Sequence, residues 1–347
     1  MKICLLPFSV LILSTLGIGT SAAAGFVVGH RDADLSRIPA EWIIAAKRDL
    51  HIAYNHTSHG SQLITGMDAL RDFPAFSSTY AWSDTSAGDS GSLSLDDNGI
   101  PGIEDLSQGD SDLDGDGIAQ WAEDTHAFLV QTDSYHVNAV IWSWCSIAGH
   151  DIQRYLDSME WLIGLFGENG SHPRAASHPV QFVFMTGHAE GEGEGDSSVS
   201  ANALIRQHCL VRNRILFDFA DLENYDPDNN YFLNKRVDDA LYYDRTPPYD
   251  SGERDANWAS EYLTRHPGSE LDLLTNGTGG YPGCGSCAHS PEDGETSDAR
   301  LNCVLKGRAA WSLFARLAGW DGGSVPPVVP GTGIIIGPLS LLLNGNF

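Results

Sequence analysis

The sequence has little positive charge. Its 347 residues carry 20 lysines and arginines against 46 aspartates and glutamates, which gives a formal net charge of −26. No Lys or Arg occurs between Arg71 and Arg154. Such a chain is repelled by phosphate backbones and by anionic headgroups. The charge therefore argues against nucleic acid or an anionic membrane surface as partner, and it equally fits a soluble protein in a salty or extracytoplasmic setting.

Long apolar runs occur only at the two ends of the chain. Lys2 is followed by an apolar run to about Ile18 and by small residues up to Ala24, the layout of a secretory signal peptide cut near Ala24. Residues 334–343 are apolar but too few to span a bilayer, and docking on the domain or an export or anchoring signal are both open. We expect an exported protein, secreted, periplasmic or at the cell surface, with no stable membrane span.

Cysteine is scarce, and loss of the signal peptide would remove Cys4 and leave five. An odd number leaves one thiol unpaired. In an oxidising compartment Cys284 or Cys287 could pair with Cys303 and pin the last loop to the last helix. A zinc site on Cys284 and Cys287 is the alternative, although no second cysteine pair follows.

The middle of the chain alternates between apolar runs and helical patterns. We expect strands at about 50–54, 137–144, 180–185 and 215–219, and helices at 39–49, 62–71, 151–166, 200–214, 257–264 and 301–317. This alternation predicts an α/β fold with a mainly parallel sheet. The expected organisation is a signal peptide (1–24), one α/β domain (25–321), and a Pro/Gly linker with an apolar tail (322–347).

An acidic segment interrupts this pattern. Residues 82–108 are rich in Ser, Asp and Gly and read as a long loop, so we expect an insertion at about 82–124. The following DSDLDGDGIAQWAED has oxygen ligands at the spacing of a twelve-residue calcium loop and resembles the loops of thrombospondin-type calcium repeats. The expected ligands are Asp112, Asp114, Asp116, the Ile118 carbonyl, Gln120 and Glu123. A bound Ca²⁺ would be structural; the alternative is an acidic loop without an ion.

Catalytically capable side chains follow the first predicted strand in the turn NHTSHGS. A serine nucleophile needs a histidine base, a group that orients the base, and donors for the oxyanion. Ser58 is the best candidate because it lies in the first turn after a strand and is flanked by Gly60; Ser61 is the runner-up. His56 and His59 are too close in sequence to act as its base and are expected to shape the site.

This turn (His56, Ser58, Gly60) resembles a divergent first block of the SGNH/GDSL-type hydrolases. The segments WSWCSIAG, MTGHAEG and ILFDFADLE, and the segment from His289 to KGRAAW, follow in the order of that family's later blocks. The resemblance implies a flavodoxin-like, three-layer fold and the activity of a carboxylic ester hydrolase.

The same resemblance implies roles for individual residues. Ser58 would be the nucleophile and His289 the base, with oxyanion donors from the Ser58 amide, from the Gly149 region and from His188, which replaces the family's asparagine. The family's orienting aspartate would stand three residues before the base, where this chain has Ser286. Other candidates for that role are Asp218, Asp221 and Asp255.

Two functions follow as expectations. The first is a secreted esterase acting on acyl esters of a polysaccharide or lipid, and the second is a non-catalytic, calcium-stabilised extracellular binding or adhesion protein. His56, His188 and His289 could instead bind a metal, although no H-E-x-x-H motif supports this. Tryptophans at 82, 142, 144 and 258 could line a sugar crevice, although burial in the core is their commoner fate.

Overall fold

The computed structural model describes residues 25–85, 91–289 and 300–323. The expected signal peptide and almost all of the linker and tail lie outside the described residues. No helix within the described ranges is long and apolar enough to cross a membrane.

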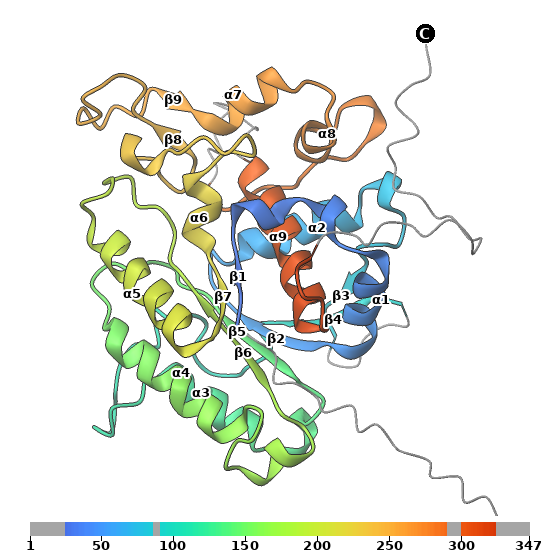
Figure 1. The fold of residues 1–347 in the computed structure, drawn as a ribbon, viewed down its shortest axis with the longest axis vertical. Coiled ribbons are helices and arrows are strands. Elements are labelled where there is room, and N and C mark those ends of the chain that lie inside the picture. Colours follow the sequence, from blue (N-terminus) through green and yellow to red (C-terminus); the bar gives the residue numbers. More distant parts are fainter. Residues whose placement is uncertain (1–24, 86–90, 290–299, 324–347) are drawn as a thin grey trace, which may run out of the picture.

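The centre of the molecule is a seven-stranded parallel sheet (Figure 1). Its strands, in spatial order, are β1 (Val27–Val28), β7 (Ile215–Phe217), β6 (Gln181–Met185), β5 (Ala139–Trp142), β2 (His51–Asn55), β4 (Leu93–Asp97) and β3 (Trp82–Ser83). All pairs of neighbours are parallel. The predicted fold class, a three-layer α/β fold with a parallel sheet, is confirmed.

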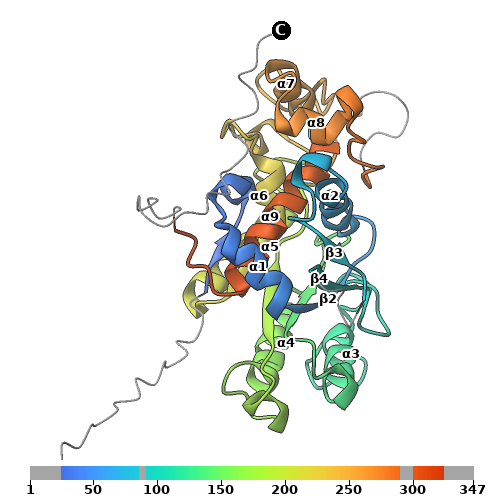
Figure 2. The ribbon, with the colours of Figure 1, turned by 90° about the vertical axis from the view of Figure 1, so that its right-hand side faces the viewer.

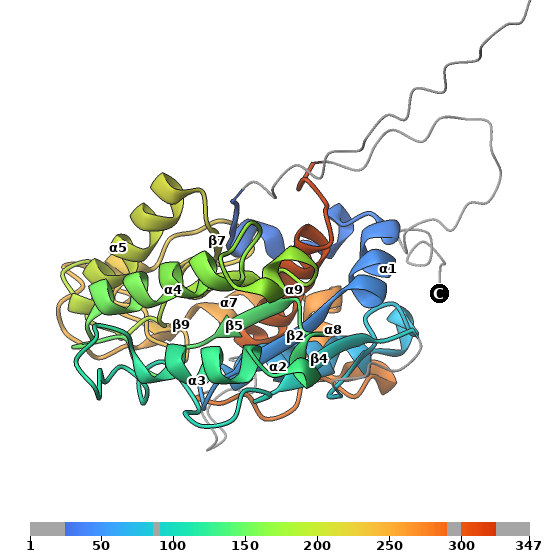
Figure 3. The ribbon, with the colours of Figure 1, turned by 90° about the horizontal axis from the view of Figure 1, so that it is seen from below.

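Helices cover both faces of the sheet. They are α1 (Ala40–Asp49), α2 (Ser61–Arg71), α3 (Gln120–Leu129), α4 (Ile152–Phe166), α5 (Ser197–Arg212) and α9 (Leu301–Leu317). Figure 3 shows α3, α4 and α5 on one side of the strands and α1 and α9 on the other. The alternation of side chains along each strand divides the core accordingly. In β2, Ile52 and Tyr54 pack with the α1, α2 and α9 layer, whereas Ala53 packs with the other layer.

The helix α9 is buried along almost its whole length, since every residue but Arg316 is shielded from solvent. It crosses α2 in backbone contact. A Cβ on Gly66 would lie 1.8 Å from the Cys303 carbonyl oxygen, and one on Gly307 would lie 2.3 Å from the Gly66 carbonyl carbon. Only glycine at both positions permits this approach. The close crossing brings polar side chains of α9 to the first turn of α2.

The segment after β7 lies beyond the carboxyl ends of the strands. It comprises α6 (Phe219–Asn224), the two-stranded sheet of β8 (Tyr242–Tyr243) and β9 (Ala256–Asn257), α7 (Trp258–Arg265) and α8 (Glu270–Asn276). Figures 1 and 2 show α7 and α8 at the same end of the molecule, above the sheet. This segment therefore covers the edge of the sheet at which ligands bind in open α/β folds.

Three expectations need correction or completion. The stretch 82–108 contributes β3 and β4 to the sheet rather than a loop outside it. The tryptophans at 82, 142, 144 and 258 are all buried and belong to the core. Of the two expected cysteine pairings, Cys287–Cys303 is formed. Cys284 is a buried free thiol, and the disulfide removes Cys287 as a zinc ligand.

Candidate active site

The strands β2 and β5 are neighbours, and the chain leaves them in opposite directions. β2 leads through α2 to β3 and β4, whereas β5 leads through α4 to β6 on the other side. The crevice outside two such strands is the usual ligand site of an open α/β sheet. Ser58 follows β2 and Cys145 follows β5, and their Oγ and Sγ atoms are 3.7 Å apart. The predicted nucleophile thus lies at the switch point of the sheet, with its side chain exposed.

The turn that carries Ser58 is fixed by contacts beneath it. The hydroxyl of buried Tyr54 donates a hydrogen bond to the Gly60 carbonyl oxygen at 2.9 Å. A Cβ on Gly60 would lie 2.2 Å from the Ser143 Oγ, so only glycine allows this packing. Ser61 Oγ donates to the Ser58 carbonyl oxygen at 2.6 Å. The Ser61 hydroxyl therefore supports the turn, which favours Ser58 over Ser61 as nucleophile.

His56 contacts the segment at the end of β4. Its Nε2 lies 2.6 Å from Asp97 Oδ1, and its amide donates to Asn98 Oδ1 at 2.9 Å. Within the described residues, no recorded contact joins His56 to His188 or His289. The three histidines considered as a metal site are therefore not brought together as one set.

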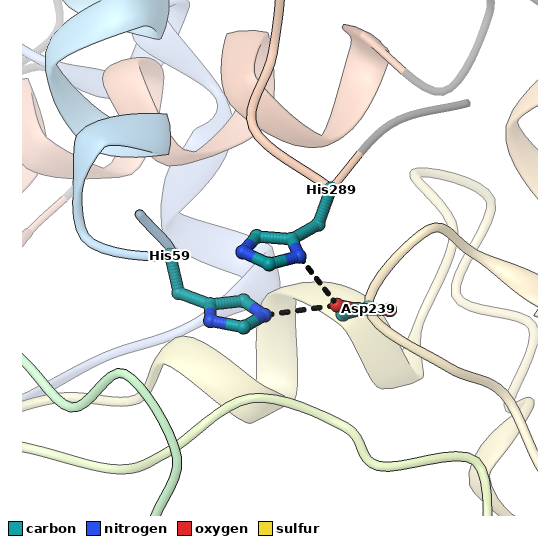
Figure 4. Close-up of side chains that lie close together, drawn as sticks. All are labelled: His59, Asp239 and His289. Atoms are coloured by element: carbon teal, nitrogen blue, oxygen red, sulfur yellow. Dashed lines mark hydrogen bonds and ion pairs between the residues drawn. The ribbon is translucent and has the colours of Figure 1, made fainter. Parts of the chain in front are cut away.

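His188 and His289, together with His59, form a stack at this edge of the sheet. The ring of His59 lies between those of His188 and His289, with centroids 3.7 Å apart on each side and ring planes within 7° and 2° of parallel. Asp239 joins them from the loop before β8: its Oδ2 is 2.8 Å from His59 Nε2 and 3.6 Å from His289 Nδ1 (Figure 4). The stack brings together residues from four segments far apart in the sequence.

The charges of this cluster are set by burial and by its members. Burial acts to raise the pKa of Asp239, but the hydrogen bond from His59 and the attraction of the three imidazoles outweigh it and hold that pKa below its usual range. Burial, and then repulsion by His59, lower the pKa of His289. At neutral pH the site therefore holds an ionised Asp239 beside a neutral His289. Because an ionised carboxylate only accepts, His289 presents Nδ1–H to Asp239 and its Nε2 lone pair is available as a base.

The backbone of His289 is held in an unusual conformation. Its φ is +59°, in the left-handed region that non-glycine residues seldom adopt. Two neighbours hold it there: Cys287 is bonded to Cys303 of α9, and the Ala288 carbonyl accepts from Gln62 Nε2 at 2.6 Å. Such strain persists where the surrounding structure determines it and clusters at functional sites.

A buried polar network lies under the histidine stack. At its centre Lys306 Nζ donates to Glu223 Oε1 at 2.6 Å and to Gln62 Oε1, with both charged side chains fully buried. Glu223 Oε2 accepts from the Ala189 amide at 2.6 Å, and Asn302 Nδ2 donates to the Asp239 carbonyl oxygen at 2.8 Å. Together with the bond from Gln62 to Ala288, these contacts fix the backbone at or next to His188, Asp239 and His289. Burial lowers the pKa of Lys306 to about 8, which still leaves it charged at neutral pH.

The group of His59, Asp239 and His289 could hold an ion, since one ligand atom from each lies within 4.8 Å of the others. The ring geometry does not suit it. An ion lies in the plane of a ligating imidazole, about 2.0–2.1 Å from the nitrogen for zinc. The two rings are parallel and 3.7 Å apart, so an ion in one plane is out of the other. Coordination by both would therefore require one ring to rotate.

The predicted oxyanion donors differ in their availability. Among the described residues, no oxygen accepts from the amide of Ser58 or of Gly149, and Gly149 has a φ of +80° and lies exposed. The ring nitrogens of His188 instead face oxygens of its own loop, the Ala189 carbonyl at 3.1 Å and Glu190 Oε1 at 3.4 Å. The two backbone amides are therefore better placed to donate than His188.

The three aspartates considered from the sequence as orienting carboxylates have recorded contacts with other residues than His289. Asp218 is bound by Arg206, Asp221 by His30, and Asp255 by the amide of Arg245. Neither His59 nor Asp239 was assigned a role in the chemistry from the sequence. Asp239 lies in an irregular loop without a motif, so no pattern could have selected it; His59 could have been selected by its position next to Ser58.

The acidic loop brings three of the predicted ligands together. The side chains of Asp112, Asp114 and Asp116 are near one another and could hold an ion. Asp112 and Asp116 also accept hydrogen bonds from amides of the loop itself. The pKa of Glu123 is raised, first by burial and then by the three aspartates. The side-chain nitrogen of Gln120, Nε2, donates to Asp124 at 3.0 Å, which leaves its oxygen for an ion or a water.

Comparison with known proteins identifies no family. No protein-family model, no curated protein and no solved structure matches this chain. Function must therefore be argued from the site itself.

Proposed function

We propose that the protein is a serine hydrolase that cleaves carboxylic esters, with Ser58 as nucleophile and His289 as base. The observation that carries the proposal is that a neutral histidine facing an ionised aspartate stacks on the residue next to an exposed serine at the switch point of the sheet. That residue is His59, directly after Ser58. A nucleophile, a base and a carboxylate that orients the base are the members of a catalytic triad.

In this mechanism Ser58 Oγ attacks the acyl carbon, and its proton passes to His289 Nε2. Asp239, facing Nδ1, stabilises the imidazolium that forms. The negative charge on the carbonyl oxygen receives hydrogen bonds from the amides of Ser58 and Gly149. His188, whose ring nitrogens face oxygens of its own loop, is the less available donor. His289 then returns the proton to the leaving alcohol, and water releases the acyl group from Ser58 by the same steps in reverse order.

The setting of the enzyme is also part of the proposal. The signal-peptide pattern at residues 1–24 indicates export, and the Cys287–Cys303 disulfide fits an oxidising compartment. We expect acyl esters of a polysaccharide or lipid as substrates. An anionic polymer is disfavoured because the chain carries a net charge of −26.

The acidic loop is proposed to bind Ca²⁺ in a structural role. The proximity of Asp112, Asp114 and Asp116 supports it, as does the raised pKa of Glu123, to which these aspartates contribute after burial. Ca²⁺ takes six to eight oxygen ligands, so the Ile118 carbonyl, and Gln120 directly or through water, would complete the set. In this proposal the ion offsets the mutual repulsion of the loop's carboxylates.

One observation favours the alternative, a non-catalytic extracellular binding protein of the same fold. Among the described residues, the side-chain contact recorded for Ser58 Oγ is with Cys145 Sγ and not with a histidine. Catalytic hydrogen bonds are often long in structures without substrate, so this contact does not exclude hydrolysis. It makes the assay of the serine the deciding experiment.

That assay compares turnover of p-nitrophenyl acetate and acetylated xylan by the mature protein and by Ser58→Ala. The matched control is Ser61→Ala, a serine of the same turn. We expect turnover to fall by a factor of at least about 1,000 in Ser58→Ala and to persist in Ser61→Ala. The absence of turnover in the wild type, or equal turnover in Ser58→Ala, would favour the binding protein.

The base is tested with a second matched pair. His289→Gln removes the histidine that faces Asp239, whereas His266→Gln removes a surface histidine that faces Asp228 at 3.1 Å. Loss of turnover is expected only for His289→Gln. Equal effects of the two substitutions would mean that His289 has no catalytic role.

A further inference from the structure

A hollow separate from the candidate active site lies beyond the carboxyl ends of β1 and β7, at the opposite end of the sheet from β3. Its volume is about 580 Å³, within the range of small-molecule sites. Leu222 of α6 and Leu305 of α9 form part of its lining. The next residue of each helix, Glu223 and Lys306, belongs to the network under the histidine stack. The hollow is thus separated from the candidate active site by these two helices.

A histidine with an unused ring nitrogen lines the hollow. His30 Nδ1 is 2.6 Å from Asp221 Oδ2, and the ring stacks on Tyr225 with centroids 4.1 Å apart. Burial opposes the ionisation of Asp221, but bonds from the side chain and amide of His30 hold its pKa below the usual range. Asp221 therefore fixes the proton on Nδ1. The opposite nitrogen, Nε2, is buried and has no hydrogen-bond partner in the part of the chain that the structure describes.

The acidic groups of the lining are already occupied. Asp34 accepts from the amide and hydroxyl of Ser36 at 3.0 and 2.7 Å, and Asp226 accepts from Asn230 and Arg265. The charge of Asp226 is therefore offset by Arg265, and the charge of Asp34 is solvated by the neutral donors of Ser36.

Two arginines of the lining make few hydrogen bonds within the protein. Arg31 lines the hollow, and none of the contacts recorded among the described residues involves its guanidinium. Arg37 uses Nη1 to donate to the Arg31 carbonyl oxygen at 3.0 Å and retains other donors. In a chain with a net charge of −26, a hollow lined by the arginines at 31, 37 and 308 and by only two carboxylates, Asp34 and Asp226, is a local exception.

We propose that this hollow, the His30 pocket, binds a small organic anion. Its carboxylate or phosphate head receives hydrogen bonds from the guanidiniums of Arg31 and Arg37. Its apolar body lies against Leu271 and Leu305, on the side of the pocket formed by α8 and α9. The ring of His30, which stacks on Tyr225 in the lining, lies beside the bound head.

The test uses calorimetry with hexanoate, hexyl phosphate and the uncharged hexanol, on the mature protein and on two variants. Arg31→Gln removes the uncommitted cation of the pocket. Arg212→Gln removes an exposed arginine on α5, and so makes the same change in net charge elsewhere. We expect one or both anions to bind, hexanol to bind weakly, Arg31→Gln to weaken the anion by roughly tenfold, and Arg212→Gln to leave it unchanged.

Histidine-selective NMR places the binding, because hexanoate is also the kind of product an esterase releases. The resonance of the His30 ring should shift with the anion in the wild type, and in Arg31→Gln the same shift should require roughly ten times as much anion. Failure of both anions to bind, equal binding by hexanol, or equal weakening by the two arginine substitutions would overturn the proposal. None of these outcomes depends on whether Ser58 is catalytic.

Discussion

Replacement of Lys306 by methionine tests how the site is held in place. Methionine preserves most of the volume but removes the charge at the centre of the buried network. Glu223 then keeps two donors, the Ala189 amide at 2.6 Å and Asn302 Nδ2 at 3.3 Å, while Gln62 Oε1 loses its donor. Breaking a buried ion pair by removing one partner costs about 3–5 kcal/mol.

The loss of stability caused by leaving the Glu223 charge unpaired has an upper limit that depends on pH. Glu223 in the variant can relieve its uncompensated charge by binding a proton. Protonation of a glutamate costs about 1.4 kcal/mol for each pH unit above about 4.3, hence about 4 kcal/mol at pH 7 and about 1 kcal/mol at pH 5. We therefore expect Lys306→Met to lower the free energy of unfolding by about 3–4 kcal/mol at pH 7 and by about 1 kcal/mol at pH 5.

Urea denaturation of wild type and variants at both pH values measures this difference. Lys47→Met is the control, since Lys47 is a half-buried lysine whose Nζ donates to the Ser78 carbonyl oxygen. It should cost no more than about 1 kcal/mol at either pH. The double variant Lys306→Met/Glu223→Gln removes both charges and should be more stable at pH 7 than Lys306→Met. A cost for Lys306→Met that is small, or equal at the two pH values, would refute the reasoning.

Three further predictions concern the ion, the base and the disulfide. A chelator should lower the melting temperature of the wild type and not that of Asp114→Ala, because an ion at a hundred times its Kd contributes about 2.7 kcal/mol; equal melting with and without chelator would contradict the calcium proposal. Since the pKa of His289 is lowered, kcat/KM should decline at acid pH with a midpoint below the ordinary histidine value of about 6.5; a midpoint above that value would contradict this assignment. Cys287→Ser opens a loop whose ends are 16 residues apart and should cost about 3 kcal/mol and reduce turnover through His289; unchanged turnover would show that the disulfide does not position the base.

The fold could be predicted where the apolar pattern is strong. The closing helix was expected at 301–317, where α9 lies, and four central strands were placed by their apolar runs. β4 could not be found this way, because its sequence LSLDD sits in a stretch rich in Ser and Asp. Its first residues are buried only because they pair beside β2, which is a tertiary contact that local composition does not encode.

The site was predicted only in part. Ser58 and His289 were selected through position after a strand and through the resemblance to a family, and His289 stacks on His59, the residue next to Ser58. Asp239 was missed because it belongs to a loop whose position depends on the network of Lys306 and Asn302. A carboxylate whose position is fixed through its backbone carbonyl, in a loop well beyond the last predicted strand at 215–219, leaves no periodic signal.

Covalent labelling tests the central claim most directly. A fluorophosphonate probe reacts with an activated serine, forming an oxygen–phosphorus bond as fluoride leaves, and peptide mass spectrometry locates the modified residue. The account predicts a single adduct on Ser58, formed by the wild type and by His266→Gln and greatly slowed in His289→Gln and Asp239→Asn. An unlabelled Ser58, or labelling that is equally fast without His289, would contradict it.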